Sequence, residues 1–512
     1  MTPAELNIFS SRLDAVCDEM GLVLRNSAFS PNIRDRLDFS CAVFDADGYL
    51  CAQAAHIPVH LGSMAFAMRD IVTRIDWSPG DQVILNDPFL GGTHLPDVTV
   101  IAPVFAEGLL RAFVVNRAHH ADIGASSPGS MPISSRLEEE GTIIAPIHLL
   151  RRGVVVDEVL ATVTAGVRNP ADAAGDFSAQ VAANRAGGER LGRLIAERGV
   201  AGFATALVEL NDYAERLAGA ALDDIPDGEY VYTDYLDDDG QGRVDIPIAL
   251  RLVIDGSRAE ADFSGTAEQV PGNVNCPLAV TAAAVYYVFR CLMPPQTPAC
   301  FGAFRRIALR APAGCLLNAR KPAAVAAGNV ETSTRVVDVV LGALSRAVPD
   351  RVPAASHGSM NNLAMGSRQG SDRPWSYYET IGGGMGAGLS GGGLDGVQTH
   401  MTNTLNTPVE VLESRYPVQV VAYGLRRGAG GRGRRAGGDG LVREYRFTAP
   451  AHVTLLTERR RHAPWGLAGG GPGATGRNLL NGTPLSPKVE CTVEPGDRLR
   501  IETPGGGGYG DP

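Results

Sequence analysis

The first twenty-four residues carry apolar side chains at steps of three and four, a spacing that predicts an N-terminal helix with one buried stripe. The stripe consists of Leu6, Phe9, Leu13, Val16, Cys17, Met20 and Leu24. The same periodicity predicts later helices, in a segment ending near residue 75 and at residues 179–198, 201–223, 278–293 and 331–347. The helical pattern is therefore confined to about the first 350 residues.

Alternating and β-branched stretches predict two β-hairpins in the N-terminal part of the chain. One covers residues 37–53 and turns at Asp47-Gly48, a pair that supplies the positive φ angles of a tight turn. The other joins residues 98–105 to residues 110–115 through Ala106-Glu107-Gly108. Further strands are expected at 81–87 and between 229 and 265. This arrangement predicts an α+β fold that is rich in strands and loops and contains several helices.

A chain of 512 residues exceeds one ordinary domain, so several lobes are expected. Pro226-Asp227-Gly228 separates the helical stretch from the strand-rich region and indicates a boundary. Glycine is unusually frequent, with 62 residues, and the chain beyond about residue 375 is glycine-rich with short strands. The predicted organisation has an N-terminal lobe at 1–225, a central α+β lobe at 226–372 and a glycine-rich C-terminal lobe at 373–512.

The charge and the cysteines narrow the class of protein. A formal net charge of −10 and a pI of about 5.5 argue against nucleic acid or an anionic membrane as a partner. The longest apolar stretch, at 278–289, is too short to span a bilayer, and the N-terminus does not read as a signal peptide. Eight cysteines without a Cys-x-x-Cys pair are typical of reduced, buried thiols. We therefore expect a soluble cytoplasmic protein.

One nucleotide-binding pattern occurs in the sequence, but its context does not suit it. Gly386–Gly391 matches the dinucleotide-binding spacing, yet the glycines that follow cannot start the helix that would hold a pyrophosphate. The sequence also contains no Gly-x-x-x-x-Gly-Lys-Ser/Thr loop, so it has no P-loop of its own.

Candidate chemistry is concentrated between residues 86 and 122, where three of the ten histidines and three aspartates occur. Imidazole nitrogen and carboxylate oxygen are the usual ligands of a catalytic divalent ion. Folding the second hairpin about Glu107-Gly108 places residue 97 roughly opposite residue 118. The residues then expected at the open end of the hairpin are His94, Asp97, His119, His120 and Asp122. Single residues of these types are often solvated turn residues or caps, but the cluster as a whole predicts a metal or catalytic site.

Side-chain direction limits which of these residues can share one ion. Neighbouring strand residues point to opposite faces, so one of His119 and His120 ligates while the other packs or hydrogen-bonds, and the sequence leaves open which. His119 and Asp122 are three apart, which suits a tight turn that brings both to one ion. Asp38 lies in the apolar part of the first hairpin, where a carboxylate is costly unless it is paired or bound to a metal.

Several long strings in the sequence match a known family. They are Asp38–Ala42, His56–Met64, Asn86–Pro88, Gly91–Asp97, Arg117–Gly124, Pro128–Pro132, Gly328–Ser333, Gln398–Thr404 and Pro504–Pro512. Taken together, they closely resemble the hydantoinase B/5-oxoprolinase family, also called the N-methylhydantoinase B family, to which acetone and acetophenone carboxylase subunits are related. The resemblance runs almost from end to end.

This resemblance implies a metal-containing enzyme subunit that works with a hydantoinase A-type ATPase in a hetero-oligomer. The partner binds ATP and phosphorylates the oxygen of a small cyclic amide or ketone, and the B-type subunit completes the reaction at a divalent metal. Mn, Zn and Fe all accept ligands of this kind. The metal ligands implied by the family are Asp38, His94, His119 and Asp122, with Asp97 and His120 in the layer behind them.

Three functions fit these residues, and the first is favoured. It is an ATP-dependent hydrolase of the hydantoinase/oxoprolinase type, in which metal-bound water attacks the activated carbonyl. Asp97, Glu139 or Glu140 then takes the proton, and His120 is a further catalytic candidate. The second function is a subunit of a ketone carboxylase of the acetone or acetophenone type, which bicarbonate dependence of ATP turnover distinguishes. The third is a scaffold subunit with a structural ion.

Overall fold

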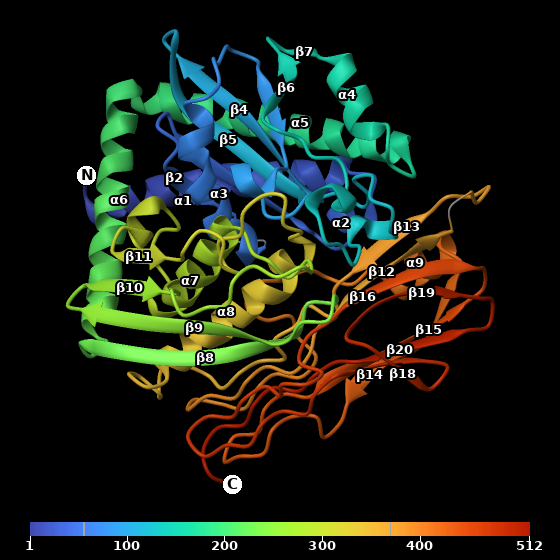
Figure 1. The fold of residues 1–512 in the computed structure, drawn as a ribbon. Helices are drawn as coiled ribbons and strands as arrows, with labels where there is room; N and C mark the ends of the chain where they lie inside the picture. Colours follow the sequence, from blue (N-terminus) through green and yellow to red (C-terminus); the bar gives the residue numbers. More distant parts are fainter. Residues whose placement is uncertain (55–56, 369) are drawn as a thin grey trace.

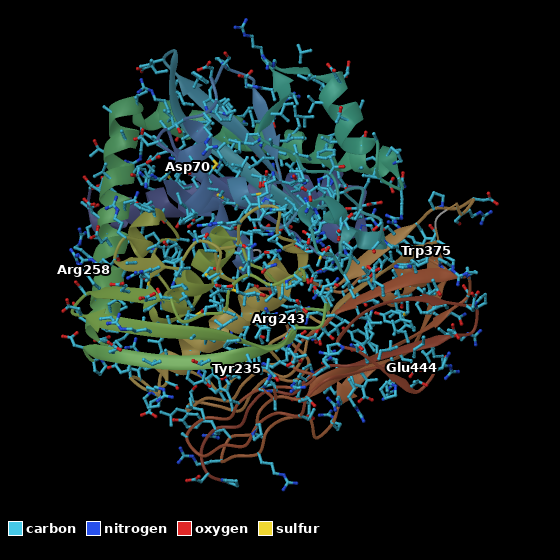
Figure 2. The ribbon with its side chains drawn as sticks, viewed as in Figure 1. Asp70, Tyr235, Arg243, Arg258, Trp375 and Glu444 are labelled. Carbon is cyan, nitrogen blue, oxygen red and sulfur yellow. The ribbon has the colours of Figure 1, made fainter. Side chains whose placement is uncertain are left out.

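The computed structural model describes residues 1–54, 57–368 and 370–512, which form four open β-sheets with helices packed against them (Figure 1). The α+β class predicted from the sequence is therefore confirmed. Side chains fill the space between these elements (Figure 2). His56, which belongs to one of the family strings, lies outside the described residues.

The N-terminal sheet has seven strands in the order β2-β1-β5-β4-β3-β6-β7. It contains both predicted hairpins, which are thereby confirmed. Its strands are β1 (Phe39–Asp45), β2 (Leu50–Gln53), β3 (Gln82–Leu85), β4 (Asp97–Ala106), β5 (Leu109–His119), β6 (Ile147–Arg151) and β7 (Val154–Val155). All strand pairs in this sheet are antiparallel.

Helices cover both faces of the N-terminal sheet. Helix α1 (Pro3–Ser27) and helix α5 (Pro170–Arg198) pack on one face. Helix α3 (Pro58–Val72) packs on the other through Met64, Met68 and their neighbours. Helix α1 begins with a capping box between Thr2 and Glu5 and buries the apolar stripe that its sequence predicts.

Alternation along β5 gives its two faces different partners. Asn116 points to α5, where its Nδ2 donates to Asn184 Oδ1 at 2.8 Å. Arg117 points to α3, where its Nη1 donates to Ser63 Oγ at 2.7 Å. By the same alternation, His119 belongs to the α3 side and His120 to the α5 side.

The hairpin β4–β5 contains a β-bulge that changes its register. Phe105 pairs with Leu110, but Val104 pairs with Ala112, so Arg111 is the additional residue on β5. As a result Asp97 lies opposite His119. The register predicted from the sequence, with residue 97 opposite residue 118, was wrong by one residue because the bulge was not foreseen.

The central region pairs a four-stranded sheet with three long helices (Figure 1). Its strands are β8 (Gly228–Asp238), β9 (Val244–Asp255), β10 (Arg258–Asp262) and β11 (Ile307–Arg310), and its helices are α6 (Val200–Asp223), α7 (Leu278–Leu292) and α8 (Ser333–Leu344). A π-helical turn, Gly328–Thr332, leads directly into α8. Helix α7 touches α3 at Gly62, where an added Cβ would lie 2.5 Å from Ala283 Cα.

Two sheets form the C-terminal region. One contains β12 (Asn362–Ser367), β13 (Ser376–Glu379), β16 (Ala451–Leu456) and β19 (Lys488–Val493), and the other β14 (Val418–Arg426), β15 (Gly440–Phe447), β17 (Arg477–Leu480), β18 (Thr483–Leu485) and β20 (Arg498–Glu502). The shorter helices are α2 (Pro31–Arg34), α4 (Asp157–Thr164) and α9 (Val409–Arg415). The three predicted lobes stay a prediction; β12 and β13 pair across the second proposed boundary at residue 372.

Much of the glycine lies in extended segments that run side by side at the C-terminal end of the molecule (Figure 1). We call the segments at 382–393, 428–438, 466–473 and 504–510 the glycine bundle. Gly506 N donates to Gly438 O at 2.9 Å, and Gly438 N donates to Met385 O at 2.9 Å. A Cβ added to Gly506 would lie 2.0 Å from Met385 O. Close approach of the backbones therefore requires glycine here.

The remaining expectations concern the membrane and the cysteines. In the described part of the chain, no helix has both the length and the apolar character needed to cross a membrane. The apolar stretch noted in the sequence becomes α7, a helix of 15 residues with a largely buried surface. All eight cysteines are free thiols, and six of them are buried.

Candidate metal centre

The register of the N-terminal sheet brings three ligand-type residues into one row. Asp97 on β4 lies directly opposite His119 on β5. On the other side of β5, Phe39 pairs with Ala118 and His119 N donates to Asp38 O at 3.0 Å, so Asp38 continues the row. Residues in register on adjacent strands point to the same face of a sheet. The side chains of Asp38, His119 and Asp97 are therefore neighbours at the ends of three strands.

His94 reaches the same place from the turn that precedes β4. Asp97 N donates to His94 O at 3.1 Å, and His94 Nε2 lies 3.3 Å from Asp97 Oδ2. One ligand atom from each of His94, Asp97 and His119 can be chosen so that all lie within 4.8 Å of one another. All three residues are buried, with at most 3% of their surface exposed.

The free atoms of these residues fit a divalent ion. Among the described residues, His94 Nε2, Asp97 Oδ1 and His119 Nε2 have no hydrogen-bond partner. His94 Nδ1 lies 3.3 Å from Ala326 O and His119 Nδ1 lies 3.0 Å from His120 O, so a backbone carbonyl faces Nδ1 of each ring and Nε2 is the nitrogen left for an ion. A buried polar atom without a partner costs about 1–3 kcal/mol, a cost that metal coordination removes.

Three residues hold the Asp97 carboxylate through its other oxygen. Oδ2 accepts from Thr93 Oγ1 at 2.5 Å and from Asn329 Nδ2 at 3.3 Å, and it lies 3.2 Å from His60 Nε2. His60 Nδ1 in turn lies 3.0 Å from Ser40 Oγ. These contacts fix the carboxylate and leave Oδ1 free. The residue pattern alone does not single out His60 or Asn329; the signal that could have found them is their presence in family strings.

Tyr378 and its neighbours support His119. The Tyr378 ring stacks on the His119 ring with centroids 4.7 Å apart and planes inclined by 3°. Arg36 Nη1 donates to Tyr378 O at 2.9 Å, and its Nη2 lies 3.6 Å from Asp38 Oδ2. Asn32 Nδ2 lies 3.2 Å from His119 Nδ1. The imidazole is thus held on two sides.

Burial and mutual attraction determine the charge states. Burial opposes ionisation of Asp97, but His94 and His60 outweigh it and hold the pKa of Asp97 well below its usual range. Burial also opposes protonation of His94, but Asp97 raises the pKa of His94 overall. Burial, followed by the charge of His94, lowers the pKa of His119 well below its usual range. His119 is therefore neutral at neutral pH, as a metal ligand must be.

Asp38 stands beside this cluster rather than inside it. Its side chain is buried and lies next to Arg36. Burial raises the pKa of Asp38, while the charge of Arg36 opposes the rise. His60 and His94 act on the same carboxyl electrostatically, which agrees with its place at the end of the row.

Two predicted residues face other partners. Asp122 Oδ1 accepts from Ser130 Oγ at 3.0 Å, and Asp122 Oδ2 accepts from Arg168 N at 2.8 Å. His120 points to α5, where its Nε2 lies 2.9 Å from Gln180 Oε1 and its ring packs on Phe177 with centroids 4.4 Å apart. The adjacent histidines therefore face opposite sides of the sheet, and His119 is the one beside Asp97.

The two candidate glutamates differ sharply in environment. Glu139 is exposed and accepts from Ser135 N at 2.8 Å. Glu140 is fully buried, and its Oε1 accepts from Ala326 N at 3.0 Å, the residue whose carbonyl lies against His94. Glu140 Oε2 has no hydrogen-bond partner in the described ranges. Burial raises the pKa of Glu140 to about 7, so this carboxyl exchanges protons near neutral pH.

The fold and the site together define a class: an α+β protein with a buried cluster of histidine and aspartate, which are residue types that bind divalent ions. Comparison with known families narrows this class. The chain belongs to the Hydantoinase B/oxoprolinase family, whose model matches residues 2–512.

Two relatives with assigned names differ in how much of their own length this chain covers. The 5-oxoprolinase 1 of Arabidopsis thaliana is 41% identical over 99% of this chain but only 42% of its own length. The B-type subunit of a putative D-/L-hydantoinase from Pseudomonas sp. strain NS671 is 32% identical over 100% of this chain and 90% of its own length. The chain thus spans about two fifths of the oxoprolinase and nearly all of the hydantoinase polypeptide.

Two solved structures share the fold. The ATP-dependent caprolactamase of Pseudomonas jessenii superposes with a TM-score of 0.92 at 28% identity, covering 100% of this chain and 91% of that chain. Acetone carboxylase superposes with a TM-score of 0.88 at 19% identity, covering 100% of this chain and 76% of that chain. The second likeness concerns the fold alone.

Proposed function

We propose that this chain is the metal-binding subunit of an ATP-dependent hydrolase that opens a small cyclic amide. One observation carries the proposal: within the described residues, His94, Asp97 and His119 form one buried cluster, and each has a ligand-type atom without a hydrogen-bond partner. The names of the oxoprolinase, hydantoinase and caprolactamase relatives support the substrate class, because each refers to a cyclic amide.

The residues of the centre have distinct roles in this proposal. His94, Asp97 and His119 hold a divalent ion such as Mn, Zn or Fe, and Asp38 is the fourth ligand. When bound, the ion supplies Lewis acidity that makes water and carbonyl groups reactive. The ligand role predicted for Asp122 is not included, because Ser130, Gly124 and Arg168 already engage its oxygens.

Glu140 is the proposed proton acceptor. Its carboxyl has a pKa of about 7, is buried, and shares the backbone of Ala326 with His94. Glu139 is exposed and Asp97 is a proposed ligand, so they suit this role less well. His120 has no proposed part in proton transfer, since it bonds to Gln180 on the opposite face of the sheet.

A partner subunit of hydantoinase A type completes the proposal. A cyclic amide resists attack by water because its nitrogen donates electrons to the carbonyl carbon, and phosphorylation of the oxygen removes this protection. ATP is bound by the partner, which agrees with the lack of a P-loop pattern in this sequence. The Pseudomonas sp. relative is named as one subunit of a hydantoinase, and this supports a heteromer.

The proposal is tested by reconstitution. The chain is co-purified with a hydantoinase A-type subunit, loaded with Mn, Zn or Fe, and supplied with 5-oxoproline, hydantoin or ε-caprolactam. We expect ring opening that requires ATP and is lost in His94→Ala. Both are followed by chromatography of the ring-opened product and by release of phosphate.

Three results would count against the proposal. Ring opening at the full rate without ATP would remove the need for the activating partner. ATP turnover that requires bicarbonate and a ketone, with no ring opened, would favour the carboxylase instead. An active complex that keeps its rate in His94→Ala would remove the metal centre from the mechanism.

A further inference from the structure

Asn329 occupies an unusual turn of backbone beside the metal centre. It lies in the π-helical turn Gly328–Thr332. Such turns are rare in proteins, and those that occur are often at functional sites. The turn is anchored at both ends, because Gly328 N donates to Asn273 O at 3.0 Å and Thr332 Oγ1 donates to Val274 O at 2.5 Å. The backbone of the turn that carries Asn329 is therefore held in place at both ends.

The orientation of the Asn329 amide follows from its contact with Asp97. Asn329 Nδ2 lies 3.3 Å from Asp97 Oδ2, which also accepts a hydrogen bond from Thr93. Only the nitrogen of an asparagine amide can donate, so this nitrogen must face the carboxylate. The oxygen, Oδ1, then faces away from Asp97 Oδ2.

This oxygen is an acceptor that no donor meets. Asn329 is 3% exposed, and Asn329 Oδ1 has no hydrogen-bond partner within residues 1–54, 57–368 and 370–512. Buried acceptors are usually paired, so an unpaired acceptor next to the Asp97 carboxylate requires an explanation, and a group of a bound molecule supplies one. An N–H group of a bound molecule would satisfy Oδ1.

We propose that Asn329 Oδ1 accepts a hydrogen bond from the ring N–H of the substrate, which selects cyclic amides with a hydrogen on nitrogen. In a small lactam ring the amide is cis, so C=O and N–H point to the same side. An amide phosphorylated on oxygen keeps its N–H while the nitrogen carries the positive charge, so a carbon–oxygen bond turned toward His94, Asp97 and His119 still directs the N–H toward the adjacent π-helical turn. The inference rests on the proposed function, and a ketone, which has no N–H, would not satisfy Asn329.

The expected selectivity is large. A site built to hydrogen-bond a substrate group rejects analogues that lack the group by up to about 10⁴-fold, because its own polar atom is left unpaired. For the wild-type complex we expect the N–H lactam to exceed its N-methyl derivative at least ~100-fold in kcat/KM. In Asn329→Ala, which also leaves room for the methyl group, we expect this ratio to fall below ~10-fold.

The test compares ε-caprolactam with N-methylcaprolactam, and 5-oxoproline with its N-methyl derivative. Ratios of kcat/KM are measured on the complex with the ATPase, and ratios of Kd are measured by calorimetry on the metal-loaded chain. A ratio does not depend on the fraction of protein that is folded. Asn329→Leu, which has a similar volume, is the second variant.

Asn273→Ala is the matched control. Asn273 is fully buried, its Oδ1 is likewise unpartnered in the described part of the chain, and its Nδ2 donates to Pro132 O at 2.7 Å. Its amide nitrogen bonds to Pro132 rather than to Asp97, and Gly328 bonds to its backbone oxygen, which alanine retains, so its variant is expected to keep the wild-type ratios.

Each outcome bears on a definite claim. Collapse of both ratios in the two Asn329 variants, with metal content unchanged, supports the inference. Unchanged ratios overturn it, as does loss of the metal from Asn329→Ala, which would make Asn329 a metal-holding residue. If the wild type opens none of the rings, the proposed function fails, while the Kd ratios still decide the role of Asn329.

Discussion

Three imidazoles approach the Asp97 carboxylate, and the second nitrogen of each ring determines its role. Both nitrogens of His60 have partners: Nδ1 lies next to Ser40 Oγ, and Nε2 lies next to Asp97 Oδ2. His94 and His119 place Nδ1 against backbone carbonyls, and in the described residues their Nε2 atoms have no hydrogen-bond partner, although His94 Nε2 also lies 3.3 Å from Asp97 Oδ2. We infer that only the latter two ligate, although all three side chains are buried.

The ligand assignment predicts different metal contents for two histidine variants. His94→Ala removes a free Nε2 and is expected to purify with less than a tenth of the wild-type metal. His120→Ala removes a ring that bonds to Gln180 and is expected to retain it. Elemental analysis of both proteins, with circular dichroism to confirm folding, checks the prediction. Equal metal contents would contradict it.

Replacement of His60 should weaken metal binding less than replacement of His94, because His60 only orients Asp97. Residues that hold a ligand in place typically contribute 10–100-fold to metal affinity. We therefore expect His60→Ala to bind the metal ~10–100-fold more weakly than the wild type, without abolishing binding. Competition with a chelator of known affinity measures the difference.

Away from the centre, the burial of His357 is expected to make the free energy of unfolding depend on pH. It is buried, its ring nitrogens have no hydrogen-bond partner among the residues described, and burial together with His400 lowers the pKa of His357 to about 3. The unfolded chain protonates this residue below about pH 6.5, whereas the folded protein does not. Stability is therefore lost as the pH falls from about 6.5 toward 3.

The test of His357 uses a variant that cannot titrate. Between pH 6.5 and pH 5 this residue should account for a loss of about 2 kcal/mol in the free energy of unfolding. His357→Phe is expected to be less sensitive to this pH change by that amount, as measured by urea unfolding at both values. An identical pH dependence in the two proteins would show that His357 does not contribute.

At the scale of elements, the contact between α3 and α7 affects the geometry of the metal centre, because α3 carries His60 and His60 contacts Asp97. Gly62 is pressed against α7, and an added Cβ would lie 2.5 Å from Ala283 Cα. Gly62→Ala should push the helices apart, at a cost of about 1–3 kcal/mol, and weaken metal binding by displacing His60. Thermal unfolding and chelator competition measure the two effects.

Gly192→Ala is the control for this change. Gly192 also lies within a helix, α5, but an added Cβ there would have no neighbour within 4 Å in the described residues. Alanine favours the helical backbone over glycine by about 1 kcal/mol, so this variant is expected to be slightly more stable and to bind metal normally. A stable Gly62→Ala with normal metal affinity would contradict the argument.

The elements were largely predictable, whereas their register was not. Periodicity and turn residues predict α1, the two hairpins and the helices α5 to α8, because these signals are local. The bulge opposite Val104 carries no comparable local signal, yet it places His119 rather than Ala118 beside Asp97. The contacts of Asp97 with His60 and Asn329 span 37 and 232 residues of sequence, so only the tertiary fold brings them together.

At the scale of the molecule, buried ion pairs tie the C-terminal region to the central one. Arg459 pairs with Asp234 of β8 at 2.8 Å, and Glu458 pairs with Arg335 of α8 at 3.3 Å. Lys488 Nζ lies 2.6 Å from Glu458 Oε1, and both side chains are fully buried. Charges so deeply buried tolerate neither separation nor the loss of a partner.

Removal of the Lys488 charge tests how strongly this buried network depends on its charge balance. Lys488→Met leaves Glu458 with less compensation and is expected to lower the free energy of unfolding by about 3–5 kcal/mol. Lys488→Met combined with Glu458→Gln should recover part of that loss, because the buried Glu458 charge that lost its Lys488 partner is removed as well. Urea unfolding of the two variants gives both values, and a double variant as unstable as the single one would contradict the explanation.

The glycine bundle also has a consequence for synthesis of the chain on the ribosome. Ala387 N donates to Gly507 O at 2.9 Å, so the segment at 382–393 acquires this neighbour only after about 120 further residues have been made. At ribosomal rates of ~5–20 residues per second this delay is roughly 6–24 s. During that interval the nascent glycine segments lack the neighbour at 504–510 and have no bulky side chains to protect them. Proteases and chaperones therefore have access to this region for longer than to the N-terminal sheet.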